Sequence, residues 1–419
     1  MDEVYGKLRD QLRERLKHAD DLPDERLREW IEEAVLSQSA ANYIPYEQKR
    51  QLTERLFNSF RGLDVLQALV DDKTVTEIMV NNFDEIFYEK AGEIHKYPAA
   101  FESREKLEDI IQLIVGKVNR AVNEASPIVD ARLQDGSRVH VVLPPIALKG
   151  PTLTIRKFPE RPLTLAELQA KGTLSEETGQ VLELLVRAGY NIFISGGTGS
   201  GKTTLLNALA ECIPQGERII TIEDSAELNI TAVPNLVKME TRNANSEGKG
   251  NVTIRELIRA SLRMRPNRII VGEVRGAEAL DMLQAMNTGH DGSISTGHAN
   301  SVEDMLSRIE TMVYSGANLP VEVIRRQISS AVEIMVHLSR LRDRSRKVME
   351  ICELVRFANG EIELNPLYRF QEQGETEDGA VIGQLAATGN RLQRRLKLVM
   401  GGFADHDLPL PLRAKGGDA

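Results

Sequence analysis

The sequence predicts an α/β protein with a largely parallel sheet, preceded by a smaller mixed α/β domain and an N-terminal helical extension. The first observation behind this prediction is the glycine-rich run GGTGSGKT at residues 196–203, which lies between a short apolar strand and a helix. The second is the alternation of strands and helices over residues 180–340, which is typical of parallel sheets. The third is an apolar residue at every fourth position near the N-terminus, which indicates an amphipathic helix.

The first 62 residues are expected to form a helical bundle. The apolar stripe of the first helix consists of Val4, Leu8, Leu12 and Leu16. Pro23-Asp24 opens a second helix, and a third is expected from Tyr46 to Phe60. The spacing fits a bundle packed on the rest of the chain and a partner-docking arm equally well, so both interpretations stay open.

Residues 63–158 indicate the mixed α/β domain. Ser103 is expected to cap a helix with one apolar face, and Asp135-Gly136 is a tight-turn signal. The expected strands lie at 77–80, 86–89, 128–133, 137–143 and 152–158. A polar, proline-containing linker is expected over residues 159–179.

The main domain is expected over residues 180–370. Its parallel strands are expected at 191–195, 219–222, 268–271 and 293–295, with an antiparallel extension after residue 332. Residues 371–390 are acidic and glycine-rich, which indicates a mobile segment. A short helix over 391–400 and a disordered tail would complete residues 371–419.

Composition limits the classes of protein that this chain can represent. A net charge of −9 disfavours a dedicated nucleic-acid binder. No apolar run approaches the roughly 18 residues of a membrane span, and the N-terminus has no signal-peptide core. The two cysteines, Cys212 and Cys352, exclude a four-cysteine zinc site within one chain. We therefore expect a cytoplasmic protein with no nucleic-acid partner.

The glycine-rich run fits the phosphate-binding pattern G-x-x-x-x-G-K-[ST] at every fixed position. Glycines allow backbone N–H groups to surround phosphate oxygens, and the following helix adds its positive end. Lys202 is expected to reach the β- and γ-phosphates, and the Thr203 hydroxyl to ligate Mg²⁺. An unliganded glycine turn is the alternative, which the flanking strand and helix disfavour. The expected nucleotide-binding residues are Gly196, Gly197, Thr198, Gly199, Ser200, Gly201, Lys202, Thr203 and Thr204.

Two further apolar strands are each followed by carboxylates. Glu223 and Asp224 follow the strand at 219–222, and Gly272-Glu273 follows the strand at 268–271. Ligands bind at the carboxyl ends of parallel strands. We expect Glu223 to polarise the attacking water and Glu273, in a Walker B arrangement, to support Mg²⁺ or its waters. A helix cap and a solvated strand end are the structural alternatives.

A segment with two histidines follows. His298 lies just past the strand at 293–295, as Glu223 does after its own strand. We expect the neutral His298 imidazole to contact the γ-phosphate. For His290, a structural hydrogen bond is an equally good interpretation.

Arginines often stabilise charge on a transferring phosphoryl group, and they commonly come from a neighbouring subunit. We single out Arg132 and Arg156 as such residues and expect most of the others to be ordinary surface or ion-pair residues. The candidates are Arg132, Arg138, Arg156, Arg242, Arg263, Arg265 and Arg275.

The order of these motifs resembles the secretion ATPase superfamily of type II secretion, type IV pili and type IV secretion. The motifs are the phosphate loop, IEDS at 222–225, RIIVGE at 268–273 and the paired-histidine segment. The resemblance covers roughly residues 63–370. Residues 252–301 are similar to the CpaF-type ATPase of tight-adherence (Flp/Tad) pili.

The resemblance implies a ring-shaped homohexamer. Each protomer would carry an N-terminal sensing domain and a C-terminal RecA-like ATPase domain, with ATP and Mg²⁺ between them. The ring would extend or retract a pilus through inner-membrane platform proteins, at the cytoplasmic face of that membrane. Glu223 would be the catalytic carboxylate, Glu273 the Walker B acid and His298 the γ-phosphate contact.

Two alternatives stay open: a type IV secretion traffic ATPase of the same fold, and a slow nucleotide-gated scaffold ring. The acidic composition disfavours a DNA translocase. The type II and type IVa assembly ATPases usually carry a four-cysteine subdomain, which this chain cannot form. One departure is Asn243-Ala244-Asn245 after Arg242, where the resembled branch usually has a proline-containing turn.

Overall fold

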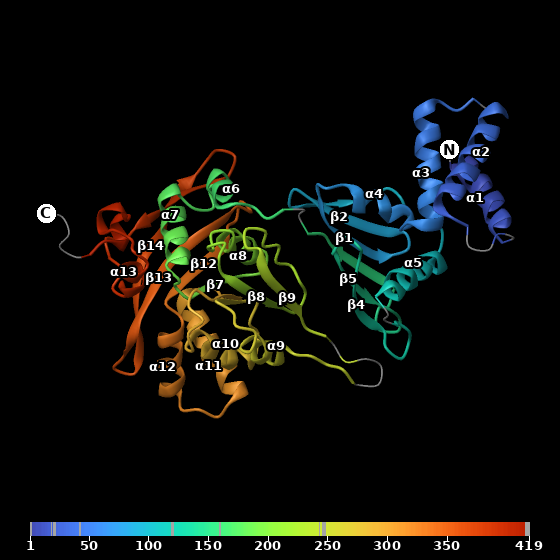
Figure 1. The fold of residues 1–419 in the computed structure, drawn as a ribbon. Helices are drawn as coiled ribbons and strands as arrows, with labels where there is room; N and C mark the ends of the chain where they lie inside the picture. The colour runs from blue at the N-terminus through green and yellow to red at the C-terminus, as the bar shows by residue number, and fades with distance from the viewer. Residues whose placement is uncertain are drawn as a thin grey trace. The chain divides into compact units, whose positions relative to one another are not determined.

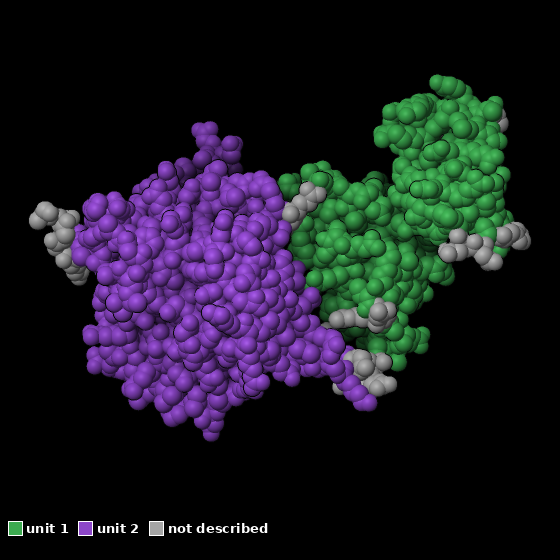
Figure 2. Space-filling view, viewed as in Figure 1, with its two compact units in different colours: residues 1–159 green, residues 160–419 purple. Residues whose placement is uncertain are grey.

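The computed structural model of the chain describes all residues except 1, 18, 20–21, 42, 119–120, 159–160, 243, 245–248 and 415–419. The chain forms two compact units, residues 1–159 and residues 160–419 (Figure 2). Pro159, where the linker was expected to begin, and the asparagines of the expected departure at 243 and 245 lie outside the described residues.

The N-terminal part of the first unit is a three-helix bundle with its own apolar core (Figure 1). The helices are α1 (Asp2–Leu16), α2 (Asp24–Ala41) and α3 (Tyr46–Arg61). Leu12, Ile31 and Leu56 are almost fully buried among them. The three expected helices are therefore confirmed. The bundle is joined to the rest of the unit, since Lys106 Nζ donates to the Ser59 carbonyl at 2.9 Å.

Two short helices, η1 (Asp64–Leu66) and α4 (Gln67–Asp71), lead into an antiparallel sheet of six strands. The strand order is β3-β2-β1-β6-β5-β4. The strands are β1 (Val75–Asn82), β2 (Glu85–Lys90), β3 (Glu93–Lys96), β4 (Ile128–Arg132), β5 (Arg138–Val142) and β6 (Thr152–Arg156). Strand β3 was not expected from the sequence, because only four residues form it and all are exposed.

Helix α5 (Arg104–Lys117) supplies the other half of this core. Its apolar side chains, including Ile111 and Ile114, pack with alternate strand residues such as Val139 and Ile155. The Ser103 side chain accepts a hydrogen bond from the Lys106 N–H, which confirms the expected cap. Because only alternate residues face α5, the opposite face of the sheet carries polar side chains.

The second unit contains a sheet of nine strands in the order β15-β14-β13-β12-β7-β11-β10-β8-β9. Strands from β12 to β9 in this order are parallel, and β13, β14 and β15 extend the sheet antiparallel. The parallel strands are β7 (Ile192–Gly196), β8 (Arg218–Glu223), β9 (Asn235–Glu240), β10 (Arg268–Val271), β11 (Ile294–Gly297) and β12 (Ile334–Arg340). The antiparallel strands are β13 (Arg346–Ala358), β14 (Glu361–Glu375) and β15 (Val381–Ala387).

Helices cover both faces of this sheet and give two apolar cores (Figure 1). One face is covered by α6 (Leu165–Ala170), α7 (Glu176–Arg187) and α8 (Lys202–Ala210). The other is covered by α9 (Ile254–Ser261), α10 (Glu278–Met286), α11 (Val302–Gly316) and α12 (Val321–Ala331). Adjacent side chains of β7 lie on opposite faces of the sheet, because Ile194 belongs to the first core and Phe193 to the second. The expected RecA-like α/β architecture is confirmed.

Two expectations about segments of the second unit, the linker and the mobile acidic segment, were wrong. The expected linker at 159–179 contains helix α6 and the start of α7, and Leu168 and Leu174 are buried in the first core. Residues 371–390 do not leave the domain as a separate segment. They complete β14 and form β15, and Arg342 pairs with both Glu372 and Glu375. The acidic composition is thus balanced locally by an arginine.

Residues 388–414, which follow β15, also pack on the second unit, whereas the sequence predicted a disordered tail after residue 401; residues 415–419 lie outside the described part of the chain. The packed segment includes α13 (Leu396–Met400), η2 (Asp405–Asp407) and η3 (Leu410–Leu412), with Leu408 and Leu412 buried. The fully buried Glu353 carboxylate accepts the backbone N–H groups of Gln393 and Arg394 and fixes the start of this segment. Among the described residues, no helix has the length and apolar content required to cross a bilayer.

Candidate functional site

The glycine-rich loop connects β7 to α8, in the strand–loop–helix setting that the sequence predicted. Gly201 precedes the helix with φ = +98°, a left-handed conformation in which a side chain would be strained. The first-turn N–H groups of α8 are therefore directed toward the loop, where a phosphate would be bound. Thr203 and Thr204 lie in this first turn and are half-buried.

Lys202 is folded back onto its own loop. Its Nζ donates to the carbonyl oxygens of Gly196 and Gly197 at 3.0 Å each, and it lies 3.3 Å from His298 Nδ1. Its side chain is buried, although lysines are seldom buried without partners. The carbonyl contacts therefore hold the ammonium where a phosphate group would take their place.

Glu273 and His298 meet beside this loop, just after the ends of the adjacent strands β10 and β11. His298 Nε2 lies 2.9 Å from Glu273 Oε1, within ion-pair distance but without good hydrogen-bond geometry. Arg275 donates to Glu273 Oε2 at 2.6 Å. Burial, followed by the charge of Lys202, lowers the pKa of His298, so its imidazole is neutral near pH 7.

Glu223 ends β8 and is only 3% exposed. Its Oε1 accepts the backbone N–H groups of Glu227 and Leu228 at 2.8 and 3.0 Å. Burial nevertheless raises the pKa of this carboxyl to about 7. A Cβ on Gly272 would lie 2.8 Å from the Glu223 side chain, so glycine before Glu273 lets the two strand ends approach closely.

Three buried polar atoms at this edge of the sheet have no hydrogen-bond partner: Ser200 Oγ, Glu223 Oε2 and Glu273 Oε1. Unsatisfied buried oxygens are rare unless a ligand, an ion or water completes them. Carboxylate and hydroxyl oxygens suit Mg²⁺, and the loop suits a triphosphate. The residues present therefore fit ATP with Mg²⁺. No cluster of three or more His, Cys, Asp or Glu that could hold a metal by protein ligands alone occurs in the described part of the chain.

The remaining candidates of the second unit have other surroundings. His290 Nδ1 lies 3.1 Å from the Ala285 carbonyl at the end of α10, as its structural interpretation predicts. Asp224 lies 3.7 Å from Arg275, and Arg242 donates to the Gly250 carbonyl. Arg263 and Arg265 lie in the turn after α9, away from the phosphate loop in sequence and topology.

The three upstream arginines form a row in the six-stranded sheet of the first unit. Arg132 is directly opposite Arg138, and Arg138 is directly opposite Arg156. Glu77 of β1 continues the row. Residues opposite each other on antiparallel strands share one face, and their neighbours are buried on the other. The row, which we call the arginine row (Arg132, Arg138 and Arg156), therefore lies on the face away from α5.

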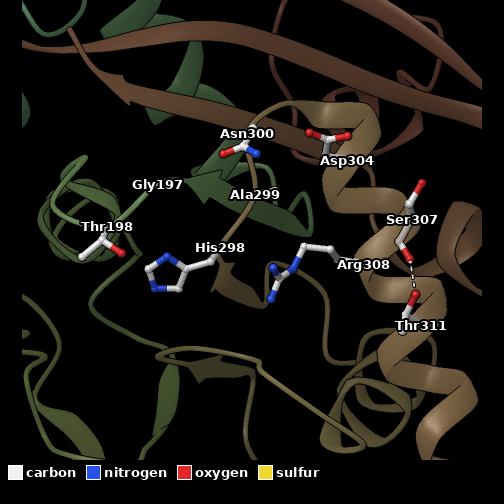
Figure 3. A pocket seen from close by; sticks show the side chains of 9 residues that line it. All are labelled: Gly197, Thr198, His298, Ala299, Asn300, Asp304, Ser307, Arg308 and Thr311. Atoms are coloured by element: carbon white, nitrogen blue, oxygen red, sulfur yellow. Dashed lines mark hydrogen bonds between the residues drawn. The ribbon is translucent and has the colours of Figure 1, made fainter. Parts of the chain in front are cut away.

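Three residues near the loop were missed by sequence reasoning. Arg346, at the start of β13, donates to the Gly199 carbonyl at 2.8 Å. The buried His337 of β12 lies 2.9 Å from Ser195 Oγ, directly beneath the loop. Arg308 of α11 lines a pocket with Thr198 and His298 (Figure 3). None lies in a recognisable motif, because sheet order and helix packing bring them to the loop from distant segments.

The chain matches the family model of type II/IV secretion system proteins over residues 60–380. A putative conjugal transfer protein of Mycobacterium tuberculosis H37Rv is 34% identical over 330 residues, which cover 77% of this chain and 93% of that protein. The type IV secretion system protein VirB11 of Brucella suis is 33% identical over 303 residues, which cover 66% of this chain and 84% of VirB11.

Among solved structures, the pilus retraction motor PilT with bound ADP has a similar fold. Its TM-score is 0.53 at 21% identity, covering 71% of this chain and 83% of PilT. The ATPase DotB of Legionella pneumophila gives a TM-score of 0.50 at 21% identity, covering 69% of this chain and 79% of DotB. These two structures support the fold, and the sequence relatives support the family. The chain belongs to the family of type II/IV secretion system proteins.

Proposed function

We propose that this chain is an ATP-hydrolysing motor that drives assembly or retraction of a tight-adherence type IV pilus. The main support for ATP hydrolysis is that four elements of a site converge at one edge of the parallel sheet. These are the phosphate loop, Glu223, Glu273 and His298. Family membership, and solved ATPases of the same fold, support hydrolysis of ATP. The assignment to tight-adherence pili rests on the resemblance of residues 252–301.

Binding of ATP begins with Lys202. Its ammonium exchanges the Gly196 and Gly197 carbonyls for the β- and γ-phosphate oxygens, which are stronger, charged acceptors. The α8 N-terminus and the loop N–H groups bind the remaining phosphate oxygens. Mg²⁺, when bound, neutralises charge on the phosphates, and Thr203 and Glu273 are the residues placed to hold it or its waters.

Glu223 orients the attacking water and accepts its proton. Its unpartnered Oε2 is available for a hydrogen bond, while the Glu227 and Leu228 N–H groups fix Oε1. A carboxyl with a pKa near 7 is well matched to proton transfer at neutral pH. The neutral His298 would contact the γ-phosphate, since its Nδ1 lies 3.3 Å from Lys202 Nζ and its Nε2 lies 2.9 Å from Glu273 Oε1.

Arg132 and Arg156 act on the nucleotide of a neighbouring subunit. The arginine row places three cations side by side on one face of the sheet, where an anionic ligand would add to the pairing that Arg138 already has with Asp130. An arginine supplied in trans stabilises charge on the transferring phosphoryl group. This assignment requires a homo-oligomer, and we propose a hexameric ring at the cytoplasmic face of the inner membrane, docked on the pilus platform proteins.

A type IV secretion traffic ATPase is the second candidate. The conjugal transfer protein and VirB11 relatives, which are 34% and 33% identical, favour it by name. A slow scaffold ring is a third possibility and predicts that function survives loss of the Glu273 carboxylate.

The test is complementation in cells that lack this chain. Wild type is expected to restore surface pili, and Glu273→Ala is expected not to, at equal protein levels. Restored transfer of DNA or protein into recipient cells, without pili, would instead identify the traffic ATPase. Pili restored by Glu273→Ala would identify the scaffold.

A further inference from the structure

A pocket of about 550 Å³ adjoins the phosphate loop on the side of α11 (Figure 3). Gly197 and Thr198 of the loop form one wall, His298 and Asn300 form a second, and α11 forms the third with Arg308. The pocket is thus continuous with the place where Lys202 would hold the γ-phosphate, since His298 Nδ1 lies 3.3 Å from Lys202 Nζ.

The Arg308 side chain is directed across the pocket toward His298 (Figure 3). Asp304 lies one helical turn earlier, at a spacing where an arginine commonly forms an ion pair. Yet among the described residues, Arg308 makes no ion pair or hydrogen bond with Asp304 or with any other group. By contrast, Arg275 and Arg325 of the same unit are paired with Glu273 and Glu310.

The electrostatics of the pocket favour an anion on its loop side. Lys202 Nζ lies 3.3 Å from His298 Nδ1 on the loop side of the pocket, and the Arg308 side chain is directed toward His298 from the opposite wall (Figure 3). Lys202 and Arg308 are therefore two cations beside the space next to His298. Asp304 also lines the pocket and opposes tight binding of an anion, so a resident anion is expected to be released rather than retained.

We propose that this pocket receives the inorganic phosphate produced by hydrolysis, and that Arg308 is its binding residue before release. This inference rests on the proposed ATPase activity. Once water has added to the γ-phosphorus and the bond to the β–γ bridging oxygen has broken, the product phosphate is free to move from Lys202 to Arg308. A planar guanidinium that can donate two parallel hydrogen bonds is well suited to hold it.

The test is a titration of inorganic phosphate into the full chain saturated with ADP and Mg²⁺, followed by calorimetry. Four proteins are compared: wild type, Arg308→Ala, Arg308→Lys and the control Arg326→Ala, which removes an exposed arginine from the neighbouring helix α12. We expect Arg308→Ala to weaken phosphate binding by about tenfold or more, because a charge-assisted hydrogen-bonding group is lost. Arg308→Lys is expected to retain part of the affinity, and Arg326→Ala all of it.

A second measurement separates binding of product from chemistry. In a single turnover, hydrolysis is followed by acid quench and free phosphate by a fluorescent phosphate sensor. Arg308→Ala is expected to slow the hydrolysis step by a much smaller factor than the factor by which it weakens phosphate binding, and to reduce inhibition by added phosphate. Equal phosphate affinity in Arg308→Ala and Arg326→Ala would overturn the proposal, as would a hydrolysis step that falls as far as phosphate binding does.

The titration requires no ATP hydrolysis, so it tests the phosphate site separately from the proposed ATPase activity. Phosphate binding that depends on Arg308 in a chain without hydrolysis would contradict the proposed function and leave the anion site in place. Hydrolysis without Arg308-dependent phosphate binding would contradict only the pocket assignment. Thermal unfolding of all four proteins shows whether any variant has lost its fold.

Discussion

The phosphate-loop edge of the second unit and the arginine row of the first unit differ in how they are built. At the loop edge, backbone N–H groups, Lys202 and carboxylates from neighbouring strands converge within one rigid sheet. In the arginine row, the cations come from three neighbouring antiparallel strands, and no glycine-rich loop accompanies them. The first can position a nucleotide by itself, whereas the second can only add charge to a nucleotide that another element positions.

The difference indicates that the reaction can be controlled by whether the arginine row reaches a nucleotide bound at the phosphate loop. We call the phosphate-loop edge the binding half of the site and the arginine row its charge-supplying half. A site divided in this way is active only when the two halves meet. Under the proposed function, ring assembly and domain motion would determine when hydrolysis occurs. Each prediction below tests one half or the dependence of one on the other.

The largest effect is expected from Lys202→Ala, which damages the binding half. The ammonium is the principal cation at the β- and γ-phosphates, so we expect kcat to fall by about 10²–10³-fold. Steady-state ATPase assays measure this, with Lys347→Ala as the control, because this half-buried lysine of the same unit donates to the Gly172 carbonyl and does not touch the phosphate loop. A comparable loss in the control would mean that the unit is sensitive to lysine removal in general.

Glu223→Gln is expected to reduce kcat by about 10²-fold or more while making the fold more stable at alkaline pH. The folded-state pKa of about 7 lies above the ordinary value of 4.5, so the folded chain holds a proton that the unfolded chain loses. Stability from this group is complete below pH 4.5 and falls as pH rises to 7, by about 3 kcal/mol.

Urea unfolding at pH 5 and pH 8 measures this effect. Glutamine cannot ionise, so the variant should lose less stability than wild type over this interval. Identical pH dependence of the two proteins would contradict the assigned burial and pKa of Glu223.

The arginine row is tested by mixing subunits. In a ring of identical subunits, Lys202→Ala is expected to abolish most ATPase activity, and Arg132→Ala is expected to lower kcat by about tenfold or more. If Arg132 acts in trans, mixed rings regain activity, because some sites combine an intact loop with an intact arginine. No recovery in mixed rings whose co-assembly is confirmed by mass would show that the arginine acts in cis. Arg156→Ala is tested in the same way.

Arg346→Ala is expected to have the smallest effect. Its hydrogen bond to the Gly199 carbonyl fixes the loop from outside, and such a bond contributes about 1 kcal/mol, or roughly fivefold in nucleotide affinity. Titration with a fluorescent ADP analogue measures it. An unchanged affinity would show that the loop holds its conformation without this contact.

The loop edge was predictable from sequence to a large extent. Its residues lie at strand ends, and parallel strand ends meet at one edge, so the loop, Glu223, Glu273 and His298 could be brought together by topology alone. Arg308 and Arg346 could not be found this way, because their approach depends on how α11 and β13 pack. The composition of residues 371–390 was misleading, since Arg342, thirty residues earlier, pairs with its glutamates and allows β14 and β15 to form.

The central claim is that a complete site requires both halves, and therefore assembly. The most direct measurement is ATPase activity against protein concentration, with native mass determined in parallel, for wild type and Glu273→Ala. We predict wild-type activity that rises as hexamers form and is absent in the variant at every concentration. Equal activity per chain in the monomer and the hexamer would contradict it.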